Sequence, residues 1–161
     1  MFKNIFAVVL GYLTTIVVVF VGLTIAYTIF GADGAFEVGT YDVTMPWIIT
    51  MFVVNIAAAV LGGIVCAKKS EHSKNAVLSF MLLIFILGMF LAFSVMNAPA
   101  DATLAVREPD IKMGDAMMNA QKPTWVLFAD PFVGVLGIML GAMLVCPCRK
   151  NKCKTAEQAV E

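Results

Sequence analysis

A carboxylate and a proline stand together inside an apolar stretch, where Asp130 and Pro131 interrupt the run from Trp125 to Cys146. Asp is a good helix N-cap and Pro suits the first helical position, so one interpretation starts a helix here. The other is a continuous helix from Trp125 that Pro131 kinks. In both, Asp130 lies about 7 to 8 Å below Trp125. Burying a charge at that depth in a membrane is costly and often serves a function.

Other polar side chains fall at comparable depth in the neighbouring apolar runs. They are Thr24, Tyr27 and Thr28 in the first run, Asn55 in the second, and Ser94 and Asn97 in the third. One interpretation is a water-filled vestibule open to the outside, with Asp130 as a cation or proton site. The other is that Asp130 caps a break in the backbone while the remaining groups form hydrogen bonds between helices. The second is favoured, because such bonds are common in membrane proteins.

Four cysteines could supply thiolate ligands, namely Cys66, Cys146, Cys148 and Cys153. Four soft ligands are the number that zinc requires, but the usual C-x2-C pairs are missing. We therefore expect reduced thiols next to the membrane and no bound metal or other cofactor. His72 is the single histidine, which excludes a pair of haem ligands and a catalytic histidine dyad. We therefore expect that the protein is not an enzyme.

Four apolar runs must position these groups, and 61% of the 161 residues are hydrophobic. The runs cover 5–30, 45–67, 76–97 and 125–146. Each reaches the roughly 20 residues that cross a bilayer core. The sequence predicts an all-α polytopic membrane protein with four transmembrane helices arranged as two antiparallel hairpins. Its membrane domain covers 1–150 with an outer loop at 98–123, and a flexible cytoplasmic tail follows at 151–161.

The basic residues next to the predicted helices divide unequally between the two sides of the membrane. One set contains Lys3, Lys68, Lys69, Lys74, Arg149, Lys150, Lys152 and Lys154, and the opposite connectors contain only Arg107, Lys112 and Lys122. Because basic residues next to a span are retained in the cytoplasm, both termini are predicted to be cytoplasmic. The predicted location is the inner membrane of a bacterial-type cell.

Tryptophans stand near the start of two predicted helices, at Trp47 and Trp125. Indole rings prefer the boundary between membrane and water. We expect both to mark the depth of the outer interface for the helices that begin there.

Small residues four positions apart predict close helix packing. The pairs are Ala58 with Gly62, Ala59 with Gly63, Gly88 with Ala92, and Gly137 with Gly141. Packing within the bundle is the simpler explanation, and an interface between copies is the other. The second and fourth predicted helices should lie centrally.

No complete catalytic or transport motif occurs in the chain. The favoured function is a non-catalytic accessory or scaffold subunit of a membrane protein complex, with twelve Phe and eleven Met as adaptable contact surface. Its expected partners are the lipid bilayer and other membrane subunits, or further copies of itself, and no nucleic acid. The alternative is a small oligomeric transporter or channel that uses Asp130 and the polar groups near it.

Overall fold

A computed structural model describes residues 2–71, 73–97, 114 and 119–145 of the chain. It contains helices α1 (Phe2–Ala35), α2 (Met45–Lys69), α3 (Lys74–Met96) and α5 (Thr124–Val145). These four are long and apolar enough to cross a membrane, which confirms the predicted all-α class and supports a multi-pass membrane protein. Most of the predicted outer loop and the whole predicted tail lie outside the described residues. The two-hairpin arrangement stays a prediction.

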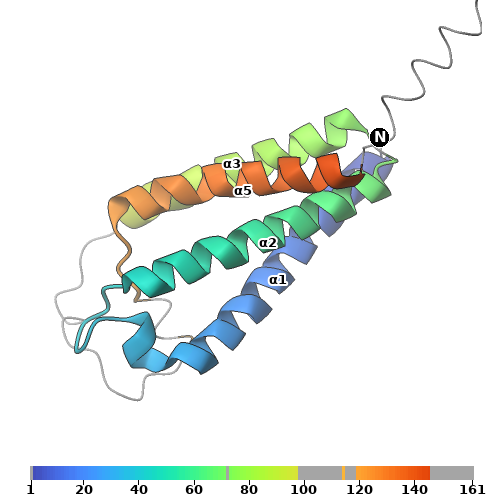
Figure 1. Ribbon diagram of the computed structural model, residues 1–161. Coiled ribbons are helices and arrows are strands. Elements are labelled where there is room, and N and C mark those ends of the chain that lie inside the picture. The colour runs from blue at the N-terminus through green and yellow to red at the C-terminus, as the bar shows by residue number, and fades with distance from the viewer. Residues whose placement is uncertain (1, 72, 98–113, 115–118, 146–161) are drawn as a thin grey trace, which may run out of the picture.

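Helix α2 holds the centre of the arrangement, because it packs most extensively against α5 and α1. Helix α5 also packs against α3. Helices α1 and α3 meet over a narrower region, and α1 does not pack against α5 in the described part of the chain. Figure 1 shows α1 diverging from α3 and α5 toward the end that contains the α1–α2 connector and the segment before α5. The four helices therefore form a bundle that is open along one side.

Glycines let α2 and α5 approach to backbone contact. A Cβ atom added to Gly63 would lie 2.5 Å from the carbonyl oxygen of Ile138, and one added to Gly141 would collide with the carbonyl oxygen of Val60. Such distances exclude any larger side chain unless the helices separate. Close approach of this kind gains dispersion energy where the hydrophobic effect no longer drives association.

The neighbouring glycine of α2 faces a different helix. A Cβ atom on Gly62 would collide with Thr15 of α1 and would lie 2.9 Å from the carbonyl oxygen of Gly11. Successive residues of an α-helix point about 100° apart, so Gly62 and Gly63 set α1 and α5 on two different sides of α2. The buried small residues of α2 and α5 from the predicted pairs are Ala58, Ala59, Gly62, Gly63, Gly137 and Gly141.

Helix α1 is longer than predicted and changes direction at Gly31. This residue has a φ of 68° and a ψ of 179°, which interrupts the helix before a final turn that ends at Ala35. A positive φ is readily accessible to glycine. The final turn is joined to the start of α2, because the Thr44 hydroxyl donates to the carbonyl oxygen of Gly34 at 2.7 Å.

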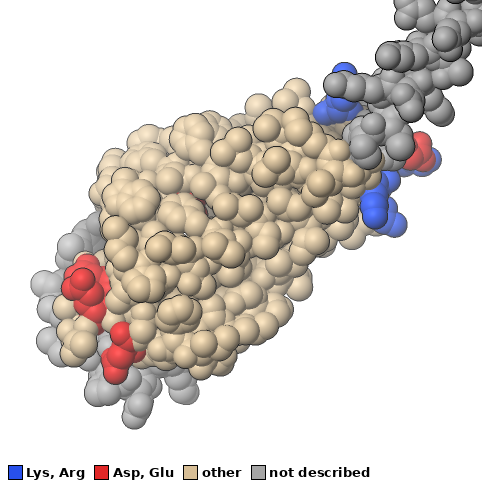
Figure 2. All heavy atoms as spheres, in the orientation of Figure 1, with Lys and Arg blue, Asp and Glu red and all other residues tan. Residues whose placement is uncertain are grey.

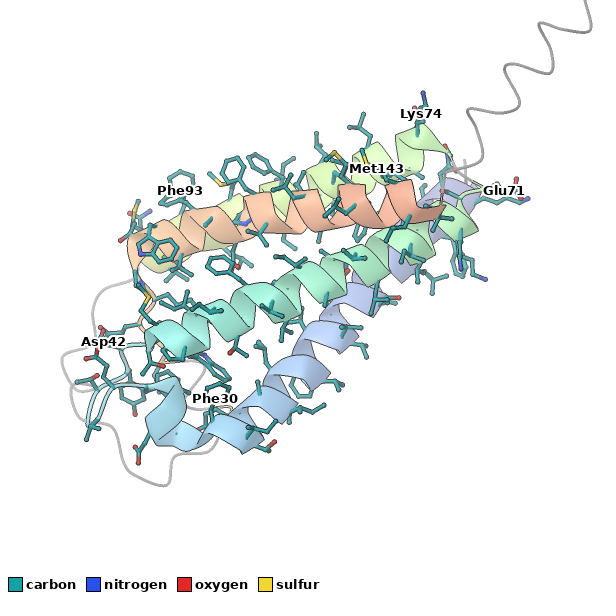
Figure 3. The ribbon with its side chains drawn as sticks, viewed as in Figure 1. Phe30, Asp42, Glu71, Lys74, Phe93 and Met143 are labelled. Carbon is teal, nitrogen blue, oxygen red and sulfur yellow. The ribbon has the colours of Figure 1, made fainter. Side chains whose placement is uncertain are left out.

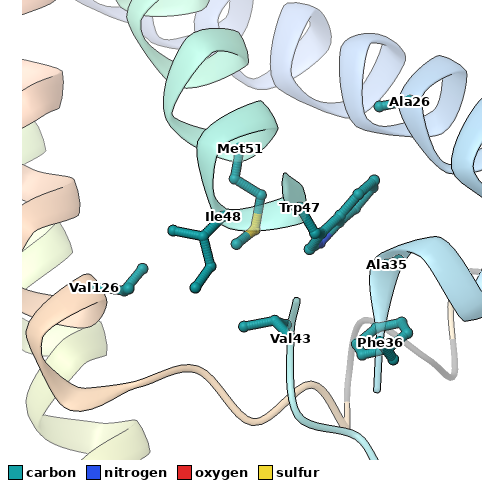
Figure 4. Packing of buried hydrophobic residues seen from close by; sticks show 8 residues of the cluster. All are labelled: Ala26, Ala35, Phe36, Val43, Trp47, Ile48, Met51 and Val126. Carbon is teal, nitrogen blue, oxygen red and sulfur yellow. The ribbon is translucent and has the colours of Figure 1, made fainter. Parts of the chain in front are cut away.

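Trp47 is the centre of a hydrophobic cluster at this end of the bundle, shown in Figure 4. Its side chain is 0% exposed, with Tyr27 and Phe30 each 6.1 Å away, centroid to centroid, in edge-on geometry. The sequence did not predict that Trp47 is buried inside the protein, where the turn after Gly31 folds over the indole ring. Trp125 differs, since it is 53% exposed.

The two connectors at this end are also hydrogen bonded to each other. Gln121 donates its backbone N–H to the carbonyl oxygen of Tyr41 at 2.9 Å and accepts from the N–H of Val43 at 3.3 Å. These bonds join the α1–α2 connector to the segment that enters α5. We call this the connector end of the bundle.

On the face drawn in Figure 2, the charged side chains of the described residues lie at the two ends of the molecule, and the surface between them shows none. Figure 3 shows Glu71 and Lys74 at one end and Asp42 at the connector end, while Phe93 and Met143 project from the sides of α3 and α5. Lys3 pairs with Glu71 at 3.0 Å, with both side chains largely exposed. We call this the lysine end. An exposed pair of this kind contributes little to stability.

Replacing Gly141 by Leu should lower the free energy of unfolding by about 2 to 3 kcal/mol, because the side chain must push α5 away from α2. Chemical unfolding of the purified protein in detergent measures the change. Ala57→Leu is the matched control, since Ala57 is an exposed small residue of α2. Equal stability of the two variants would contradict the close packing at Gly141.

Trp47→Ala should cost about 3 to 5 kcal/mol, because it empties the centre of the connector-end cluster. The same unfolding experiment with Trp125→Ala provides the comparison, since that ring is half exposed. A larger loss for Trp125→Ala would show that the interface, and not the cluster, holds this end together.

Candidate functional site

A cavity of about 460 Å³ lies in the angle between α1 and α3, with α2 and α5 as its floor. It is an open groove, and its lining is mainly apolar. We call it the α1–α3 groove. Its lining includes Tyr12, Thr15 and Val19 of α1, Asn55 and Ala59 of α2, Ile84, Leu87, Gly88, Leu91, Ala92 and Val95 of α3, and Lys122, Leu127, Asp130, Pro131, Gly134 and Ile138 from the segment that contains α5.

The groove contains a pair of polar side chains from its two floor helices. The side-chain amide of Asn55 on α2 donates to Oδ1 of Asp130 on α5 at 2.9 Å. Both residues are partly buried. Within the described residues no cation pairs with Asp130, since the ion pair found there joins Lys3 to Glu71. The carboxylate therefore has one hydrogen-bond donor and further accepting capacity.

Asp130 is not a helix cap. Helix α5 runs continuously from Thr124 through Pro131, so the alternative in which a helix starts at Asp130 is wrong. Because Pro131 has no N–H, it cannot donate to the carbonyl oxygen of Leu127, as a residue in mid-helix normally does. Leu127 also lines the groove.

Gly88 of α3 accommodates the proline ring. A Cβ atom added to Gly88 would lie 2.8 Å from Cγ of Pro131. Pro131 itself is buried. Because Gly88 has no side chain, Pro131 packs directly on α3. This contact helps to set the position of Asp130, the residue before it.

The other predicted polar residues do not join this site. Thr24 donates to the carbonyl oxygen of Phe20 at 2.7 Å, and Asn97 donates to that of Phe93 at 2.9 Å. Tyr27 packs on the indole ring of Trp47. None of the three lines the groove, so only Asp130, Pro131 and Asn55 of the predicted set meet there.

Three polar residues of the groove were missed in the sequence. Tyr12 and Thr15 come from α1, and Lys122 lies just before α5. The signal that could have found the first two is their spacing, since Tyr12, Thr15 and Val19 share one face of a helix with 3.6 residues per turn. Gly11, the residue before Tyr12, packs closely on α2, since a Cβ atom added to it would lie 3.0 Å from the carbonyl oxygen of Gly62.

The predicted thiolate cluster falls mostly outside the described residues, as Cys146, Cys148 and Cys153 lie there. Cys66 is buried in α2 and is not part of a disulfide. Among the residues that the structure describes, no group of three or more His, Cys, Asp or Glu side chains could hold a metal ion.

No protein-family model, no curated protein and no solved structure matches this chain. The α1–α3 groove is therefore the basis for a proposed function. Its lining combines apolar walls with one carboxylate, one amide, two hydroxyl side chains and one lysine. Such a site is suited to binding a largely apolar partner that brings a hydrogen-bond donor or a positive charge to Asp130.

The Asn55–Asp130 bond should show a coupling energy of about 0.5 to 2 kcal/mol in a double-mutant cycle of Asn55→Ala and Asp130→Ala. The free energy of unfolding in detergent is measured for the parent, both single variants and the double variant. A parallel cycle with Thr24→Ala and Asp130→Ala should give no coupling, because Thr24 bonds within its own helix. If the losses in unfolding free energy from the two single substitutions were additive, the hydrogen bond would not be a stabilising contact.

Proposed function

We propose that the protein is a non-catalytic accessory or scaffold subunit of a membrane protein complex, and that it binds a transmembrane helix of its partner in the α1–α3 groove. The observation that carries this proposal is the open side of the bundle. Helix α1 reaches α3 only near the lysine end, where a Cβ atom on Gly11 would lie 3.2 Å from the ring of Phe80. Farther along, the two helices separate around an apolar groove.

The wall of the groove is shorter than a membrane span but long enough to contact several turns of one helix. Its lining on α3 extends from Ile84 to Val95, or about 16 Å, which corresponds to three turns of a helix. The side chains Leu87, Leu91 and Val95 are exposed on this wall. In a bilayer these positions face lipid or another helix, and a helix offers the closer packing.

The proposal also includes the orientation of the bundle across the membrane. Lys3, Lys68, Lys69 and Lys74 are exposed at the lysine end, which supports a cytoplasmic position for that end under the positive-inside rule. The extensive contacts of α1 with α2 and of α3 with α5 suit two antiparallel hairpins. In the bacterial-type inner membrane that we propose, the groove would then lie in the middle and outer part of the bilayer.

The transporter alternative has less support from the groove. A water-filled path requires polar lining along its length. The lining is mainly apolar, and Thr24, Tyr27 and Asn97 lie elsewhere. A carboxylate beside an amide in a lateral groove is better suited to contact with another membrane component.

Filling the groove should release the partner. The parent protein is captured from gently solubilised native membranes, and proteins bound in stoichiometric amounts are identified by mass spectrometry. Val19→Trp places an indole in the groove and should reduce the bound partner about tenfold or more, whereas Leu13→Trp changes an exposed residue of α1 outside the lining and should not.

A parent protein that is repeatedly isolated as a lone monomer would overturn the proposal. A homo-oligomer that persists in Val19→Trp would move the transporter alternative ahead. Retention of the partner by both variants would show that it binds another face.

A further inference from the structure

We infer that the helix received by the α1–α3 groove carries a lysine or arginine, and that this side chain pairs with Asp130. The inference rests on the proposed function and specifies the chemistry of the partner. Its basis is a carboxylate that lies within the membrane span and lines an open groove.

Depth makes the carboxylate costly when it is unpaired. Asp130 is six residues beyond the start of α5 at Thr124, or about 9 Å along the helix. An ionised group below the membrane surface is paired in most membrane proteins, because few solvent molecules can stabilise its charge there. Asn55 supplies one neutral donor, which does not balance the negative charge.

The groove contains further hydrogen-bond acceptors, which suit a side chain with several N–H donors. Asp130 retains accepting capacity on its carboxylate, and Leu127 has a carbonyl oxygen to which Pro131 cannot donate. Asn55 uses its amide N–H on Asp130, which leaves its side-chain oxygen as an acceptor. An ammonium group has three donors and a guanidinium group has five, so either can bind Asp130 and still donate to a further acceptor.

Lys122 does not supply this charge in the structure. It lines the groove but lies before the first residue of α5, at the connector end, and it forms no ion pair with Asp130. Lys122 also lines a second cavity with Glu37 and Asp42, two carboxylates of the α1–α2 connector. Because no basic side chain among the described residues pairs with Asp130, we place the cation on the molecule that enters the groove.

A helix suits this groove better than a compact lipid head group. The apolar wall of α3 extends for about 16 Å, from Ile84 to Val95, and Asp130 and Asn55 interrupt an otherwise apolar floor. A transmembrane helix with one basic residue can contact the whole wall and bring a single positive charge to Asp130. Long basic side chains also keep part of their apolar stem in contact with the walls.

The test uses the full-length protein in phosphatidylcholine vesicles with a synthetic Leu/Ala-rich helix of about 22 residues. This peptide carries one lysine about 9 Å from its outer end and a photoreactive leucine one turn away. A second peptide has methionine in place of the lysine. The cross-linked fraction is measured against the ratio of peptide to lipid, and the adducts are mapped by mass spectrometry.

The lysine peptide should bind the parent about tenfold more tightly than Asp130→Asn, with adducts on Leu87, Leu91 or Val95. Asp130→Asn preserves a group that can bond to Asn55, and its unfolding midpoint verifies that it folds. The methionine peptide should not distinguish the two proteins. Asp130→Glu should restore most of the preference for the lysine peptide.

Other outcomes separate the two proposals. Equal binding of both peptides, blocked by Val19→Trp, would overturn the pairing with Asp130 and leave the helix-binding groove in place. Binding of neither peptide, together with Asp130-dependent labelling by a photoreactive long-chain amine, would replace the helix by a cationic amphiphile and overturn both.

Discussion

The close approach of backbones at two adjacent glycines of α2 is the constraint on which the rest of this structure depends. Gly62 faces α1 and Gly63 faces α5, and neither position has room for a methyl group. Because adjacent residues point about 100° apart, the two neighbouring helices are held on separate sides of α2. Helices α1 and α5 therefore do not pack on each other, and the angle between them becomes the α1–α3 groove once α3 packs on α5.

Two hydrophobic clusters keep that angle fixed. At the lysine end, Phe80 of α3 and Cys66 of α2 belong to one cluster, close to Gly11 of α1. At the connector end, Trp47 anchors the last part of α1 through the turn after Gly31. Helix α1 is thus tied at both ends while its middle borders open space. A groove framed in this way is preformed, so binding in it costs less ordering than binding that first requires the helices to separate.

Apolar length made the four membrane helices predictable, and small residues indicated that α2 and α5 are central. The sequence did not show which polar side chains share a site, because helices that are apolar on every face carry little facing information. Thr24 and Asn97 could not be separated from Asn55 on that basis. The burial of Trp47 was not predicted for another reason: it depends on the reversal at Gly31, where a positive φ brings the chain back over the indole ring. A local preference for the interface gives way to such tertiary packing.

Asp130 joins α5 to α2 through the hydrogen bond from Asn55, but the close packing of the helices does not use its charge. The closest contacts of α5 with α2 are made at glycines, and those with α3 include Pro131 against Gly88. Neither set needs a carboxylate, and an apolar residue of similar size would avoid the cost of placing a charge there. Asn55 offsets only part of that cost, since a single amide donor is neutral. The charge of Asp130 is therefore not explained by the packing of the four helices, and this is the reason for proposing a cationic partner in the groove.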